Sequence, residues 1–230
     1  MNASLRTLLS GVIDYAGLFP PARLPLDQAI RIYLRHLDGP DGWMLGRFVI
    51  PAARLEELAP YHGELAATFR PVGFAALGRG GDGEEAARES LAADCDAVAR
   101  FRSASRLAVD VLELRGPLGP GTAAGAAAAV GLECFYEVSF DGEWRTCLRE
   151  AAAPLAAFNA AQSPRRAGLK LRTGGLEASA FPSVEQVAHA LHACRGAGVP
   201  LKFTAGLHHP IRRFDAGVRC DMHGFVNVFV

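Results

Sequence analysis

The sequence of 230 residues lacks the features that mark secreted, membrane-spanning or polyionic proteins. Its five cysteines are an odd number without C-x-x-C spacing, so a disulfide framework is not expected and a reducing cytoplasm is the expected location. The 24 Lys and Arg residues balance the 24 Asp and Glu residues, which argues against nucleic acid as a partner. Gly, Arg or Pro interrupts every apolar run before the ~18 residues of a membrane span. The first ten residues do not resemble a signal peptide.

What the sequence does contain is an alternation of short apolar segments and helical patterns. The apolar segments are predicted strands, mostly flanked by Gly or Pro; they cover residues 12–15, 47–50, 72–77, 107–112, 133–138, 169–172, 201–204 and 225–229. Apolar stripes at helical spacing occur over residues 26–37, 144–158 and 184–191. Ser183 and Gln186 fit a capping box at the start of the last of these helices.

This alternation favours parallel strands joined by helices. Eight strands in about 220 residues favour one (β/α)₈ barrel domain over residues 1–230. An open sheet of six or seven strands is the alternative, because the first and last strands have the weakest patterns. A barrel normally ends with a helix after its eighth strand, whereas the sequence stops at Val230 inside an apolar run. We therefore expect the final helix to be missing, with a longer natural chain or another element covering the last strand.

Four predicted strands carry charged residues that an apolar barrel interior does not explain: Asp110, Glu137, Lys170 and Lys202. The two lysines are expected to point inward, because their neighbours in sequence are apolar and suit the helix-covered face. Neighbouring parallel strands lie about 5 Å apart, so the two lysines are predicted to be adjacent. Adjacent cations favour a neutral amine, the form that attacks carbonyl groups, and Asp110 or Glu137 would transfer protons.

The order of these motifs resembles that of deoxyribose-phosphate aldolase and its class I aldolase relatives. Residues 170–174 (KLRTG) are similar to the K-x-x-T-G segment whose lysine forms the Schiff base, and residues 202–206 (KFTAG) resemble the K-x-x-G-G segment. Residues 109–111 (VDV) match the strand with the proton-relay aspartate, and residues 135–137 (FYE) match the next strand. The resemblance implies a cofactor-free barrel enzyme in which Lys170 forms the Schiff base, Lys202 tunes it and Asp110 relays protons.

The chain departs from this family where the family binds phosphate. The residues after the second lysine read GLHHP instead of a glycine pair and an Arg-Thr loop, and Arg172 replaces a small polar residue. We therefore expect a small carbonyl or sugar-derived substrate, for which an anionic group is allowed but phosphate is in doubt. The predicted substrate-binding residues are Arg172, Thr173, Gly174, Gly175, Thr204, Gly206, His208 and His209.

Two other interpretations stay open. His208, His209 and His223, with Asp221 or Glu137, suit a metal-dependent lyase or hydrolase, although adjacent histidines point apart on an extended chain. Alternatively, the charged strand residues form internal salt bridges in a non-catalytic barrel that acts as a scaffold. A homodimer is compatible with each interpretation, because barrels of this type often dimerise.

Overall fold

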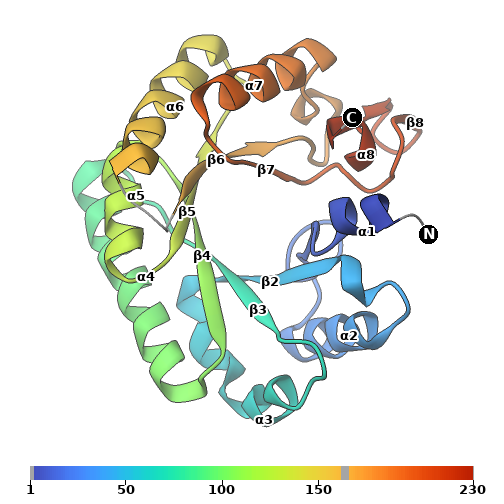
Figure 1. Cartoon of the computed structure of the whole chain (residues 1–230), viewed down its shortest axis with the longest axis vertical. Coiled ribbons are helices and arrows are strands. Elements are labelled where there is room, and N and C mark those ends of the chain that lie inside the picture. The colour runs from blue at the N-terminus through green and yellow to red at the C-terminus, as the bar shows by residue number, and fades with distance from the viewer. Residues whose placement is uncertain (1–2, 162–165, 230) are drawn as a thin grey trace. The chain divides into compact units, whose positions relative to one another are not determined.

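The computed structural model describes residues 3–161 and 166–229, and strands alternate with helices along that chain (Figure 1). One sheet contains seven strands in chain order. They are β1 (Ile13–Tyr15), β2 (Leu45–Pro51), β3 (Gly73–Leu77), β4 (Ala108–Arg115), β5 (Glu133–Val138), β6 (Ala167–Arg172) and β7 (Leu201–Thr204). Each of the first seven predicted strands is therefore confirmed. A two-stranded antiparallel sheet, which the sequence did not predict, consists of β8 (Arg213–Asp215) and β9 (Cys220–Met222).

Helices connect most of the strands. They are α1 (Ala3–Leu9), α2 (Leu26–Asp38), α3 (His62–Ala66), α4 (Glu84–Ser105), α5 (Pro120–Ala129), α6 (Trp144–Ala161), α7 (Val184–Ala197) and α8 (Phe225–Phe229). The 3₁₀ helices are Gly42–Met44, Ala52–Tyr61 and Ala178–Ala180. The capping box predicted for α7 is present: the Ser183 hydroxyl accepts from the Gln186 N–H, and the Gln186 side chain accepts from the Ser183 N–H.

Contacts divide the chain into two compact units, of which the first contains residues up to 79 and 88–112. Its core is a chain of aromatic rings from β1, α2, β2, β3 and α4. Successive ring centroids of Tyr15, Tyr33, Phe48, Phe74 and Phe101 lie 5.4–6.0 Å apart, the spacing of favourable aromatic pairs. Burial raises the pKa of Tyr33 to about 12, and its hydroxyl donates to the Gly46 carbonyl at 2.9 Å.

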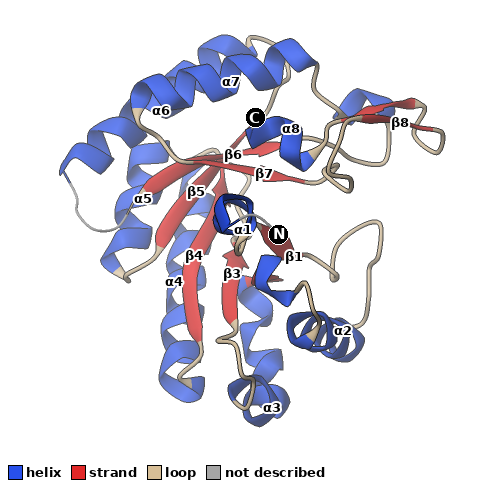
Figure 2. Cartoon of the chain, turned by 45° about the vertical axis from the view of Figure 1, so that its right-hand side comes forward, coloured by secondary structure: helices blue, strands red, loops and turns tan. Residues whose placement is uncertain are grey.

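The second unit contains residues 80–87 and the chain from Glu113 onward. Strand β5 pairs in parallel with β6, and β6 pairs in parallel with β7. Helix α6 packs against α5, α7, β5 and β6, and α6 and α7 lie on the same side of these strands (Figure 2). The helices thus cover the face that carries Leu169 and Leu171, both fully buried, as expected for an outward-facing apolar set.

The predicted eighth strand is wrong. Residues 225–229 form the short helix α8, and an isolated parallel bridge joins His209 to Gly224 just before it. The alternation of Phe, Val and Asn is typical of a strand, but strand propensity expresses fit to a pleated surface, and tertiary contacts override it. Here the first N–H groups of the helix, those of Phe225 and Val226, donate to the His209 and Pro210 carbonyls, which supplies partners that the helix itself cannot provide. In the described residues, the architecture is therefore that of a (β/α)₈ fold without its eighth strand and final helix.

Candidate active site

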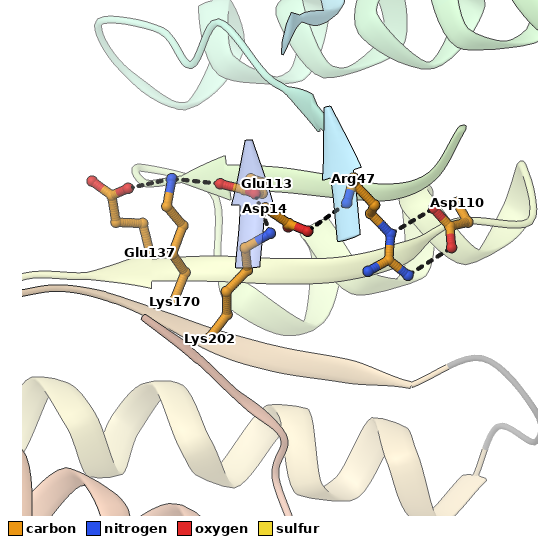
Figure 3. Close-up of polar contacts among 7 residues, drawn as sticks. All are labelled: Asp14, Arg47, Asp110, Glu113, Glu137, Lys170 and Lys202. Atoms are coloured by element: carbon orange, nitrogen blue, oxygen red, sulfur yellow. Dashed lines mark hydrogen bonds and ion pairs between the residues drawn. The ribbon is translucent and has the colours of Figure 1, made fainter. Parts of the chain in front are cut away.

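Three charged side chains lie in one row across β5, β6 and β7. The strand register pairs Glu137 with Lys170, and Lys170 with Lys202. Residues paired in register share a face of the sheet, so the predicted adjacency of the two lysines is confirmed. All three belong to the second unit, and Figure 3 shows Glu137 and Lys170 pointing toward one another.

Glu113 completes this group from β4, and it is not among the site residues predicted from the sequence. Its Oε2 lies 2.7 Å from the Lys170 Nζ, and its Oε1 lies 2.7 Å from the Lys202 Nζ. The Lys170 Nζ also lies 2.8 Å from the Glu137 Oε2. We call Glu113, Glu137, Lys170 and Lys202 the lysine–glutamate network; in it one carboxylate holds both amines and one amine holds both carboxylates.

Burial differs across the network. The Glu113 and Lys170 side chains are 2% and 5% exposed, whereas those of Lys202 and Glu137 are 14% and 19% exposed. Burial acts to raise the pKa of Glu113, but the attraction of the Lys170 and Lys202 charges outweighs it and lowers the pKa below its usual value. Glu113 is therefore a fixed anion at neutral pH, while Glu137 is the carboxylate with the greater access to solvent.

A signal for Glu113 was present in the sequence. Val109, Val111 and Glu113 follow the period of two along β4, and all three are buried. The predicted strand ends at residue 112, three residues before the end of β4, so it leaves Glu113 outside. Buried glutamates are rare unless they are paired, and the two lysines are its partners.

Asp110 lies in the first unit, where Arg47 holds it. The Arg47 Nε and Nη2 atoms donate to the two Asp110 oxygens at 2.7 and 2.6 Å, and the Arg47 N–H donates to Asp14 at 2.7 Å (Figure 3). A Cβ at Gly73, on the intervening strand β3, would lie 3.6 Å from the Arg47 Cγ, an ordinary van der Waals distance, so the Arg47 side chain lies next to Gly73. The carboxylates that contact the lysines are Glu113 and Glu137, and the proton-relay role of Asp110 stays a prediction.

The segments that follow the two lysines are joined closely. The buried Thr173 donates its N–H to the Thr204 carbonyl at 2.9 Å and its hydroxyl to the Ala205 carbonyl at 2.7 Å. Ala205 and Gly206 both have positive φ, 64° and 72°. A Cβ on Gly206 would come within 2.3 Å of the Thr173 carbonyl oxygen, so only glycine fits that turn. Thr173 and Gly174 thus meet the turn at Gly206, which brings these predicted substrate-binding positions together.

The other predicted substrate-binding residues are more dispersed. Arg172 ends β6, is exposed and pairs in register with Thr204. The half-buried Gly175 follows Gly174, and a Cβ there would meet the Ala180 Cβ at 2.6 Å. His208 is exposed and His209 is half-buried. Their substrate contacts remain predictions.

The histidines do not gather into a ligand set. His223 is buried, and its Nε2 lies 2.6 Å from the Pro182 carbonyl oxygen, while Asp221 is paired with Arg212 at 2.9 Å. Across residues 3–161 and 166–229, no three His, Cys, Asp or Glu side chains are placed to hold a metal ion. Nor does any helix in these ranges have the length and apolar character needed to cross a membrane.

Comparison with known proteins identifies the fold. No family model matches the sequence. No curated protein matches it either. The tetrameric deoxyribose phosphate aldolase of Aeropyrum pernix is similar in structure, with a TM-score of 0.54 and 13% identity over 97% of this chain and 89% of that chain.

A modular endo-β-1,4-mannanase from Cellulomonas fimi has a TM-score of 0.59 and 14% identity over 93% of this chain and 59% of that chain, so this chain spans less than two thirds of it. Identities this low are informative about the fold alone. They show that the chain has a (β/α)₈-type fold, from which one element is missing.

Proposed function

We propose that the protein is a Schiff-base lyase of the class I aldolase type, with Lys170 as the residue that forms the imine. The observation that carries the proposal is the in-register pair Lys170 and Lys202, whose amines share the buried carboxylate of Glu113. Buried charge is costly and is concentrated at functional sites. The order of the lysine motifs, which resembles that of the aldolases, supports the same assignment.

The contacts suggest a role for each member of the network. Lys170 gives its ammonium proton to Glu137, the carboxylate with access to solvent, and the free amine then attacks the substrate carbonyl carbon. Glu137 returns that proton to the carbinolamine hydroxyl, which leaves as water and yields the protonated imine. Lys202 and Glu113 keep their opposite charges throughout, so they hold the amine in place and stabilise charge without exchanging protons.

A non-catalytic barrel is the second candidate, because every lysine amine in the network has a carboxylate within 2.8 Å. A closed set of ion pairs is what an internal structural network requires. Buried ion pairs are weak evidence for stability, however, since apolar side chains of similar volume often replace them without loss. Four charged residues in one interior are therefore better explained by chemistry.

Borohydride trapping separates the two candidates. The protein is incubated with small aldehydes, ketones or 2-oxo acids in the presence of borohydride, and intact mass and peptide mapping locate the adduct. We expect one covalent adduct at Lys170, and none in Lys170→Arg, which keeps the charge but is not nucleophilic at neutral pH. The matched variant Lys202→Arg keeps the adduct at Lys170 with a lower rate. Wild-type protein that forms no adduct with any carbonyl compound would favour the structural network.

A further inference from the structure

A buried hydroxyl group without a protein partner lies on the same strand face as the Lys202 amine. Thr204 follows Lys202 by two residues on β7, so the two side chains project from the same face, about 7 Å apart along the strand. The Thr204 Oγ1 is buried, and within the described residues no hydrogen-bond partner reaches it. Buried polar groups are almost always hydrogen-bonded, so an exception requires an explanation.

The surroundings of Thr204 hold it in place without using its hydroxyl. Its carbonyl accepts the Thr173 N–H at 2.9 Å, and the Thr173 hydroxyl donates to the next carbonyl, that of Ala205. The backbone at Thr204 is therefore fixed by these hydrogen bonds, whereas the Thr204 hydroxyl oxygen takes no part in them. Valine has nearly the same shape and would avoid the cost of an unpartnered hydroxyl, which points to a ligand as the hydroxyl's partner.

The charge of the lysine–glutamate network restricts what that ligand can be. Two amines are matched by two carboxylates, Glu113 and Glu137, so the network offers no net positive charge. Arg172, which pairs in register with Thr204, is exposed at the end of β6 and is not part of these ion pairs. A phosphate or carboxylate group placed beside Glu113 and Glu137 would meet like charge.

We infer that the site accepts an uncharged hydroxycarbonyl compound, whose carbonyl group meets Lys170 and whose neighbouring hydroxyl group is hydrogen-bonded by Thr204. This inference rests on the proposed Schiff-base function and specifies its substrate class. Thr204 is then a specificity residue: its hydroxyl distinguishes a hydroxylated carbonyl compound from the deoxy analogue, because the analogue leaves that buried hydroxyl unpartnered.

The test compares borohydride trapping of matched probes by wild-type protein, Thr204→Val and the control Thr204→Ser. The probes are glycolaldehyde against acetaldehyde, hydroxyacetone against acetone, and dihydroxyacetone phosphate as the anionic compound. We expect the preference of the wild-type protein for the hydroxylated probe to exceed that of Thr204→Val by about five- to ten-fold, the effect of one neutral hydrogen bond. Comparison with Thr204→Val cancels the intrinsic reactivity of each probe, and Thr204→Ser keeps the preference.

Thermal stability gives a second, independent measurement. If the hydroxyl has no protein partner, Thr204→Val melts at the same temperature as the wild type or higher; a lower melting temperature would contradict the inference. Two results would overturn the inference and leave the Schiff-base function standing. One is trapping at Lys170 with the same preference for the hydroxylated probe in wild type and Thr204→Val. The other is faster trapping of dihydroxyacetone phosphate than of hydroxyacetone. The absence of trapping with every probe would instead overturn the function itself, together with the inference.

Discussion

Removal of the Glu113 charge is expected to destabilise the protein more than any other single change in the lysine–glutamate network. In Glu113→Gln, two ammonium groups that shared one carboxylate stay on the order of 5 Å apart, which at an effective dielectric constant of about 20 costs about 3 kcal/mol. Loss of one partner from a buried ion pair costs about 3–5 kcal/mol. Both values suit a side chain that is 2% exposed, so we expect a loss of about 3 kcal/mol.

Urea unfolding followed by circular dichroism measures this loss, with Glu137→Gln as the matched control. Glu137 is 19% exposed and contacts Lys170, so water compensates part of its loss and we expect about 1 kcal/mol. The reasoning is refuted if Glu113→Gln unfolds within 0.5 kcal/mol (about the uncertainty of the method) of the wild type, or if Glu137→Gln is the less stable variant.

The pH dependence of the same measurement checks the sign of the effect. The pKa of Glu113 is lowered in the folded protein from its usual 4.5, so its contribution to stability is complete above pH 4.5 and is lost as the pH falls through the folded value. The difference in unfolding free energy between wild type and Glu113→Gln is therefore greatest at neutral pH and shrinks below pH 4.5. A difference that grows in acid would contradict this linkage.

Three further predictions concern contacts outside the network. Arg47→Leu leaves Asp110 without its bidentate partner, but the pair is 31% and 39% exposed, so thermal unfolding should show a loss of only about 1 kcal/mol; a loss above 3 kcal/mol would be inconsistent with such exposure. Thr173→Val removes the donor to the Ala205 carbonyl and should cost about 1–2 kcal/mol in urea unfolding, whereas Thr173→Ser should stay near the wild type. Asp94 is fully buried and accepts the Arg79 N–H and Nε at 2.9 and 3.0 Å; Asp94→Asn should cost about 2 kcal/mol by calorimetry, and an unchanged melting temperature would argue against the pair.

The regular part of the fold could be predicted because its sequence patterns and its tertiary contacts agree. Strands β5 and β7 have the bounds expected from their apolar runs, and the Ser183 cap begins α7 as its sequence suggests. The segment 225–229 could not be predicted, because alternating Phe and Val residues fit a strand equally well, and its hydrogen bonds to residues 209 and 210 are tertiary contacts that the local sequence does not reveal. The β8–β9 hairpin has short strands without an apolar alternation to reveal them.

The candidate site, too, could be predicted from the sequence only in part. Lys170 and Lys202 could be predicted to be neighbours, because consecutive strands of a barrel lie side by side and both side chains point to the same face. The register that pairs them is seen only in the structure. Their partner Glu113 was not predicted, because the predicted strand ends at residue 112 whereas β4 continues to Arg115. The bidentate pairing of Asp110 with Arg47 joins residues 63 positions apart in the sequence, so it becomes visible only once β2, β3 and β4 are side by side.

Borohydride trapping followed by peptide mapping is the most direct test of the central claim, that Lys170 forms an imine with a carbonyl substrate. We expect one adduct per chain, located at Lys170, absent from Lys170→Arg and retained in Lys202→Arg. An adduct that maps to Lys202, or wild-type protein that stays unmodified by every aldehyde, ketone and 2-oxo acid, would contradict it.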